Sequence, residues 1–216
     1  MPISQQFDDS YYAQVYGDYF RQNSPRKLRF YRQLLLSHMT ASESPRVLDL
    51  GCAFGLFLAA LPERFRKFGV DANSYALGGA AERVPEGSFA AADCGDPPLV
   101  SRFDAIAALD VLEHIPAVEH TLEFVGRSLT PGGIFLVVVP VYDGPMGPII
   151  RTLDRDPTHV HKRSRAWWLE LISRKFEVTF WTGIFRYLAG GRFYLHLPTR
   201  ALRQVAPAIA IVGKLR

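Results

Sequence analysis

A carboxylate and two glycines stand together in the stretch VLDLGCAFGLFL, residues 47 to 58. Asp49 lies near the end of an apolar run that indicates a buried strand, and Gly51 and Gly55 flank a turn before a helical pattern. Glycines let the backbone approach a ligand closely, and the start of a helix offers free N–H groups. A carboxylate beside such a turn does not suit a pyrophosphate. It suits a ligand with a cationic group, such as an amino acid moiety, although a tight turn without a ligand is the structural alternative.

Two further acids end the next two apolar runs. Asp71, in GVDAN, lies 20 residues after Gly51, the offset at which one carboxylate can accept hydrogen bonds from both hydroxyls of a ribose. Asp93, in AADCGD, can accept a hydrogen bond from the exocyclic amine of an adenine. Asp96 is the second candidate there, although DPP is more typical of a turn. Taken in order, the three acids indicate one wall of a site for an adenosine joined to an amino acid.

Strand and helix patterns alternate from Arg46 onward, and they must position these acids. Residues 135–139 are apolar without a break, as expected of a strand covered on both faces. The alternation predicts an α/β fold with a mainly parallel sheet and helices on both faces. Ligands bind such sheets outside the carboxyl ends of the strands, which is where each acid falls. The strand patterns lie at 46–51, 67–72, 88–93, 103–111, 130–140, 176–185 and 208–215.

The residues before the first strand have a different character. Two helical patterns lie within residues 8–39, and Ser24 with Pro25 can begin the second. SESPR then breaks the pattern near 42–46. We therefore expect an N-terminal helical cap at 1–45 and a ligand-binding domain at 46–216. The early tyrosines either close over the ligand as a lid or pack in the core: Tyr11, Tyr12, Tyr16 and Tyr19.

Five motifs in order now carry a family resemblance. VLDLGCAFG, GVDAN, AADCGD, FDAIAALDVLEHIP and LTPGGIFLVVVP resemble those of class I S-adenosylmethionine-dependent methyltransferases. The likeness is greatest to the ubiquinone-biosynthesis-like group of small-molecule methyltransferases, and it covers about residues 46–140. Each motif alone is weak, but five at matching spacing are specific. The resemblance implies a Rossmann-like sheet of seven mostly parallel strands and S-adenosyl-L-methionine as the cofactor.

The resemblance also implies a role for each matching position. The chain departs from the family pattern at Ala53, because the family often has Gly-x-Gly where this chain has Gly-Cys-Ala. The methionine part of the cofactor would be surrounded by Asp49, Gly51, Cys52, Ala53 and Gly55. Asp71 would contact the ribose. Ala72, Asp93 and Cys94 would contact the adenine, and Leu109 and Asp110 would contact the sulfonium.

Two histidines are candidate catalytic bases. His114 leaves the fourth strand where the methyl group should be, and an imidazole with an ordinary pKa of ~6.5 can take a proton from a hydroxyl at neutral pH. In the resembling group, however, Glu-His at this place commonly begins the next helix and is structural. His159 is the better candidate for a base or substrate contact, because THV resembles a recurrent element of the group. A loop histidine with structural partners is its alternative.

A metal site is a further alternative, although we assign no metal ligands. Asp110, Glu113 and His114 have D-x-x-E-H spacing, and His159 and His161 follow the fifth strand. Some methyltransferases that resemble this chain gather such residues around a divalent cation. Two carboxylates and one or two imidazoles could bind Mg²⁺ or Zn²⁺ there.

These observations predict a methyltransferase that acts on a small-molecule, sugar or lipid-linked acceptor, by O-methylation. An N-methyltransferase is the rival enzyme, and it would need less help from a base. A regulatory or assembly protein that binds S-adenosylmethionine without catalysis also remains open. A nicotinamide dehydrogenase on a similar sheet is disfavoured, because the chain has no GxGxxG at the first turn.

Composition limits partners and location. The 216 residues carry a net charge of +4, and no acid follows Glu177, so the basic C-terminal region could contact an anionic surface. The sequence gives no reason to expect nucleic acid as a partner. No apolar run approaches the ~20 residues of a membrane-spanning helix, and the N-terminus does not resemble a secretory signal. Two cysteines make no disulfide framework, so we expect a cytoplasmic protein with both reduced.

Overall fold

A computed structural model describes residues 19–154, 156–186 and 194–215. Tyr11, Tyr12 and Tyr16, three of the four predicted lid residues, lie outside them. The strands are β1 (Arg46–Leu50), β2 (Arg66–Asp71), β3 (Ser88–Ala91), β4 (Phe103–Leu109), β5 (Leu129–Pro140), β6 (Phe176–Phe185), β7 (Leu197–Thr199) and β8 (Ala208–Leu215). The helices are α3 (Tyr19–Gln22), α4 (Pro25–His38), α5 (Leu56–Ala60), α6 (Ser74–Arg83), the 3₁₀ turn η1 (Leu112–His114), α7 (Val118–Ser128), α8 (Gly147–Leu153) and α9 (Arg165–Ser173).

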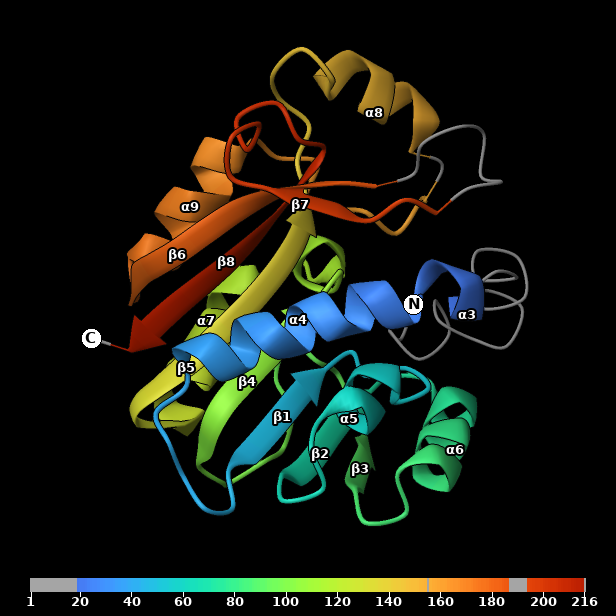
Figure 1. The fold of residues 1–216 in the computed structure, drawn as a ribbon, viewed down its shortest axis with the longest axis vertical. Coiled ribbons are helices and arrows are strands. Elements are labelled where there is room, and N and C mark those ends of the chain that lie inside the picture. Colours follow the sequence, from blue (N-terminus) through green and yellow to red (C-terminus); the bar gives the residue numbers. More distant parts are fainter. Residues whose placement is uncertain (1–18, 155, 187–193, 216) are drawn as a thin grey trace.

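The described strands form one sheet in the order β3-β2-β1-β4-β5-β8-β6-β7 (Figure 1). The first five strands in this order pair in parallel, and β8, β6 and β7 are antiparallel to their neighbours. The predicted α/β fold is confirmed, but the sheet has eight strands rather than seven. The additional strand is β7, which pairs only with the end of β6 and is too short, at three residues, to show an alternating pattern.

Helices cover both faces of the sheet, as the apolar run in β5 predicts. Its residues alternate between the faces: Phe135 and Val137 pack in one core with α7 and α9, whereas Ile134 and Leu136 pack in a second core with α4, α5 and α6. This alternation follows from the two-residue period of a strand. The sheet is therefore buried between two layers of helices, and the loops after its strands begin at the edge of this core.

Local sequence explains where the helices begin and end. The side chains of Ser24 and Ser164 accept hydrogen bonds from backbone N–H groups at the starts of α4 and α9, as N-cap residues do. Helix α5 ends at Ala60. Leu61 is extended because it precedes Pro62, and a residue before proline avoids helical backbone.

The predicted cap at 1–45 is described only from Tyr19. Helix α4 packs on the sheet, and Tyr31, Leu34 and Leu35 are buried in the second core. The division at residue 45 therefore stays a prediction. No helix within the described ranges is both long enough and apolar enough to cross a membrane.

Candidate functional site

A cavity of about 930 Å³ lies at the carboxyl ends of the parallel strands. With one exception, every residue that the sequence analysis assigns to the cofactor or to catalysis lines it. Gly55 is the exception: it begins α5 with a φ of 69°, and a side chain there would meet Ala80 of α6. The nominated residues in the cavity wall are Asp49, Gly51, Cys52, Ala53, Asp71, Ala72, Asp93, Cys94, Leu109, Asp110, His114 and His159.

The loop after β1 depends on Asp71 for its shape. Ala53 has a φ of 43°, which is unusual for a residue with a side chain, and its N–H donates to Asp71 Oδ2 over 2.8 Å. Asp71 Oδ1 accepts from the N–H of Asn73 over 2.9 Å. One carboxylate at the end of β2 therefore fixes two turns, and it explains how alanine serves where the family often has glycine.

Asp49 is the buried acid in the middle of this wall. Its residue is 3% exposed, and Oδ1 has no hydrogen-bond partner among the described residues. Burial raises the pKa of this carboxyl well above its usual range, and the charge of Asp71 raises it further. A cationic ligand group would lower the pKa again and would satisfy the buried oxygen.

The remaining nominated residues after β3 differ in burial. Asp93 is exposed, and its Oδ1 accepts from the N–H of Gly95 over 2.7 Å. Cys94 is buried against the backbone of Val70, and burial raises the pKa of its thiol. The thiol of Cys52 is also protonated by burial, so neither cysteine is a nucleophile here.

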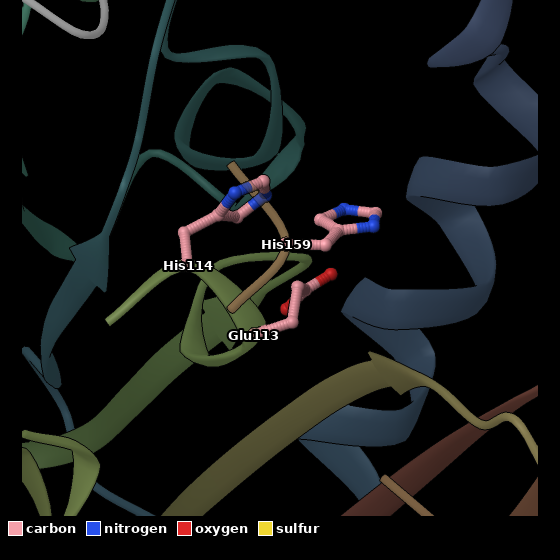
Figure 2. A group of neighbouring side chains, drawn as sticks. All are labelled: Glu113, His114 and His159. Carbon is pink, nitrogen blue, oxygen red and sulfur yellow. The ribbon is translucent and has the colours of Figure 1, made fainter. Parts of the chain in front are cut away.

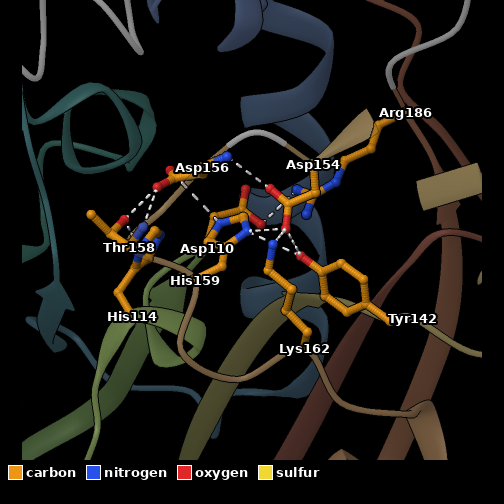
Figure 3. Close-up of polar contacts among 9 residues, drawn as sticks. All are labelled: Asp110, His114, Tyr142, Asp154, Asp156, Thr158, His159, Lys162 and Arg186. Carbon is orange, nitrogen blue, oxygen red and sulfur yellow. Dashed lines mark hydrogen bonds and ion pairs between the residues drawn. The ribbon is translucent and has the colours of Figure 1, made fainter. Parts of the chain in front are cut away.

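A buried ion pair follows β4. Asp110 has a φ of 60°, and its Oδ1 accepts from Arg186 Nη1 over 2.5 Å (Figure 3). Its Oδ2 lies 3.6 Å from Lys27 Nζ. Although burial raises the pKa of Asp110, the two cations lower it to about 2. This pairing could not be predicted from the sequence, because the three residues come from segments far apart in the chain.

A second polar group lies around Asp154, which follows α8. Tyr142 Oη donates to Asp154 Oδ2 over 2.6 Å, His159 Nδ1 lies 2.9 Å from the same oxygen, and Lys162 Nζ lies 2.8 Å from it (Figure 3). Burial raises the pKa of Asp154, but these three partners together bring it below the ordinary value. The sequence pointed to His159 as a candidate base, but it did not reveal Asp154 or Tyr142 as its partners.

His114 lies beside His159, with 4.6 Å between the ring centroids. Its Nδ1 lies 2.7 Å from Thr158 Oγ1. Burial lowers the pKa of His114 to about 4, with His159 as the second cause, so this imidazole is neutral at pH 7. A neutral imidazole with so low a pKa is a weak base, although it can still donate or accept a hydrogen bond.

Glu113, His114 and His159 form a cluster whose candidate metal-ligand atoms all lie within 4.8 Å of one another (Figure 2). Glu113 is 1% exposed, its Oε2 has no hydrogen-bond partner among the described residues, and burial raises its pKa well above the usual range. Two members of the sequence alternative lie outside the cluster. Asp110 pairs with cations, and His161 Nε2 contacts the carbonyl of Ile115 over 2.9 Å.

A family model described as a methyltransferase domain matches residues 19–183. Because this is more than half of the chain, the chain belongs to this methyltransferase-domain family. The predicted class, a class I S-adenosylmethionine-dependent methyltransferase with that cofactor, is confirmed at the level of the family. The likeness to the ubiquinone-biosynthesis-like group stays a prediction.

Two curated relatives are similar over part of their length. The trans-aconitate 2-methyltransferase of Variovorax paradoxus (strain S110) is 31% identical over 112 residues, 50% of this chain and 43% of the relative. That of Azoarcus sp. (strain BH72) is 31% identical over 121 residues, 54% of this chain and 48% of the relative. The chain thus spans about half the length of the curated relatives it matches.

Solved structures share the fold at low identity. The N-methyltransferase NodS of Bradyrhizobium japonicum WM9, in complex with S-adenosyl-L-homocysteine, has a TM-score of 0.65 and 16% identity over 89% of each chain. A Thermotoga maritima protein, described as a possible histamine N-methyltransferase, has a TM-score of 0.69 and 15% identity over 95% of this chain and 98% of its own. Identities this low speak for the fold alone.

The ion pair at Asp110 leads to a stability prediction. We expect Arg186→Met to lower the free energy of unfolding by about 3 kcal/mol, because it leaves a buried carboxylate with only Lys27 as a distant partner. Since folding depresses the pKa of Asp110, this stabilisation is present above the unfolded pKa of ~3.9 and is lost as the pH falls toward 2. Urea unfolding at pH 7, 4 and 3 measures the difference.

The exposed pair Arg127–Asp96 is the matched control for this experiment, because both side chains are more than half exposed. We expect Arg127→Met to cost below about 1 kcal/mol at each pH. Equal losses for the two variants would contradict the assignment of a stabilising buried pair.

Proposed function

We propose that this chain catalyses transfer of a methyl group from S-adenosylmethionine to an oxygen of a small-molecule acceptor, with a sugar or lipid-linked molecule as alternatives. The observation that carries the proposal is that one cavity is lined both by the acids Asp49 and Asp71 and by the His159–Asp154 pair. A donor and an acceptor that share this cavity would meet without a further binding step. Holding two reactants in place can supply about 7–11 kcal/mol at best.

The donor half of the cavity fits S-adenosylmethionine, which supplies a methyl group on a sulfonium when it is bound. Asp49 Oδ1 is a buried acceptor without a partner, and we assign it to the ammonium of the methionine part. Asp71 uses one lone pair of each oxygen for the loops and can accept the ribose hydroxyls with the others. Among the residues that line the cavity, we assign Ala72, Asp93 and Cys94 to the adenine and Leu109 and Asp110 to the sulfonium.

In the acceptor half we assign His159 as the general base. Nδ1–H donates to Asp154, which holds the ring in the tautomer whose Nε2 can take a proton. The proton of the acceptor hydroxyl would pass to Nε2 as the oxygen is methylated, and Asp154 would stabilise the resulting imidazolium. His114, with its low pKa, would instead orient the hydroxyl by a hydrogen bond.

Two other chemistries have specific support. The trans-aconitate relatives make a carboxylate oxygen a candidate acceptor, and NodS keeps N-methylation open. The residues Glu113, His114 and His159 also fit a divalent cation, because Glu113 is a buried carboxylate without a partner. Such a cation would polarise an acceptor hydroxyl, and His159 would then be a ligand rather than a base.

We also propose a cytoplasmic setting and no role for nucleic acid. Both cysteines are free and buried, which suits a reducing compartment. Contact between the basic C-terminal region and an anionic surface stays a prediction.

Substitutions at the two buried acids should show which part of the cofactor each acid binds. We expect Asp49→Asn to weaken S-adenosylhomocysteine binding about tenfold or more, because the ammonium loses its charged partner. Binding of 5′-methylthioadenosine, which lacks the amino acid part, should not change. Asp71→Ala should weaken both ligands, since it disturbs the ribose contact and the loop.

Calorimetry with the two ligands measures these effects, and Glu63→Gln, at an exposed acid, is the control. An unchanged affinity of Asp49→Asn for S-adenosylhomocysteine would remove the ammonium assignment. Unchanged affinities of Asp71→Ala would remove the ribose assignment.

The base assignment leads to a kinetic prediction. With an acceptor found by screening for released S-adenosylhomocysteine, we expect His159→Gln to lower kcat about 100-fold or more, while the affinity for S-adenosylhomocysteine is kept. Asp154→Asn should lower kcat less and should change its pH dependence, because Asp154 acts through His159. His38→Gln, at the C-terminal end of α4 and outside the cavity wall, is the control.

A wild-type kcat for His159→Gln across the pH range would exclude it as the base. Turnover that is lost in EDTA and restored by Mg²⁺ would assign His159 to a cation instead. If no acceptor is methylated although the cofactor binds well, the result would favour a non-catalytic binding protein.

A further inference from the structure

Helix α8 has an apolar face that is exposed rather than packed in a core of the sheet. Met146, at the N-cap, and Ile149, Ile150 and Leu153 have the spacing i, i+3, i+4 and i+7, so they share one face of the helix. In a surface helix, such a face normally packs against the core of its domain. Among the described residues, however, neither core contains a member of α8, and the buried residue of this helix is Gly147.

The exposed face of α8 borders the cavity. Ile149 is 50% exposed and Leu153 is 68% exposed, yet both line the cavity wall, as do Met146 and Ile150. Figure 1 shows α8 beyond the end of β5, outside the helical layers that cover the sheet. Single exposed apolar residues are normal on a protein surface, whereas a contiguous apolar face marks a place where something binds.

The chain on both sides of α8 belongs to the polar group around His159. Tyr142 precedes the helix and Asp154 follows it, and their oxygens lie 3.0 and 2.9 Å from His159 Nδ1. The N–H of Asp154 also donates to the carbonyl of Ile150 over 2.8 Å, so the residue that orients the proposed base ends the helix as well. A molecule that covers the apolar face would therefore lie beside His159.

We propose that α8 binds an apolar group of the methyl acceptor, so that the acceptor is an alkyl or aryl hydroxy compound rather than a free sugar. The inference rests on the proposed function, in that a hydroxyl of this acceptor reaches His159. An alkyl chain against Ile149 and Leu153 would remove apolar surface from water on both sides, which is worth about fourfold in affinity per methylene. A sugar would instead place hydroxyls against side chains that offer them no hydrogen bond.

The size of the cavity agrees with two ligands. Its volume of about 930 Å³ is near the upper end of the ~300–1,000 Å³ of single small-molecule sites, so an acceptor of several carbons fits beside the donor. A second copy of this chain is the other occupant to consider for the apolar face. A stable interface buries about 800 Å² on each partner, which four side chains of a seven-residue helix cannot supply alone.

The test uses two phenols of equal length that differ in one chain atom, 4-butylphenol and its ether 4-(2-methoxyethyl)phenol. Phenol and 4-ethylphenol complete the series. Calorimetry with and without saturating S-adenosylhomocysteine measures binding to the wild type, to Ile149→Asn, to Leu153→Asn and to the double variant. Leu153→Met keeps the apolar character, and Leu202→Asn is the matched control, because this leucine is 55% exposed and lies outside the cavity wall.

We expect the affinity of the wild type to rise about two- to fourfold with each methylene and to favour 4-butylphenol over its ether about fivefold or more. Each single asparagine variant should lower that preference, and the double variant should reduce it to about twofold or less. Leu153→Met and Leu202→Asn should keep it. Every variant should bind S-adenosylhomocysteine as the wild type does, which also shows that it is folded.

The inference would be overturned by equal binding of 4-butylphenol and its ether, by a preference that the double variant keeps, or by an equal loss in Leu202→Asn. Absence of phenol binding while S-adenosylhomocysteine binds normally would also overturn it. A dimer that the double variant dissociates, as measured by light scattering, would assign the face to a second copy instead. The proposed function fails separately: a phenol that binds with the expected preference but is never methylated would support the apolar site and count against O-methylation.

Discussion

The carboxylate of Asp110, directly after β4, must be neutralised by positive charge, and two segments from elsewhere in the chain meet it for this reason. Its backbone is left-handed, and its partners are Arg186, directly after β6, and Lys27 of α4. An unpaired carboxylate at such depth would cost several kcal/mol, so the three segments are constrained to meet. The ion pair therefore joins α4 and the end of β6 to the end of β4 in the cavity wall.

The buried acids of the cavity fall into two kinds. Asp110 and Asp154 have close cationic or hydrogen-bonding partners, and the pKa of each lies below its ordinary value. Asp49 and Glu113 each have a buried oxygen without a partner, and the pKa of each is raised. The first kind maintains the structure and orients a histidine. The second kind can bind a cationic group of a ligand or hold a proton. These acids therefore indicate where a ligand binds.

The donor wall could be predicted from the sequence because its residues follow consecutive strands. Parallel strands end at the same edge, so Asp49, Asp71 and Asp93 had to line one cavity once the alternation was recognised. Gly55 shows the limit of that reasoning, since its spacing suggested a ligand contact, whereas it begins a helix packed on Ala80.

The acceptor half could not be predicted in the same way. Lys27 meets Asp110 through the packing of α4 on the sheet, and a hydrophobic pattern does not specify which polar residue at its edge faces inward. Tyr142 and Asp154 meet His159 through α8 and an irregular loop, whose path depends on tertiary contacts rather than on periodicity. The three-residue strand β7 is likewise defined only by its pairing with β6.

The central claim is that this cavity binds S-adenosylmethionine rather than another nucleotide. Calorimetric titration of the whole chain with S-adenosylmethionine, S-adenosylhomocysteine and NAD tests it most directly. We expect one equivalent of either sulfur compound to bind and NAD to give no heat of binding. Tight binding of NAD, with no response to S-adenosylmethionine, would contradict it.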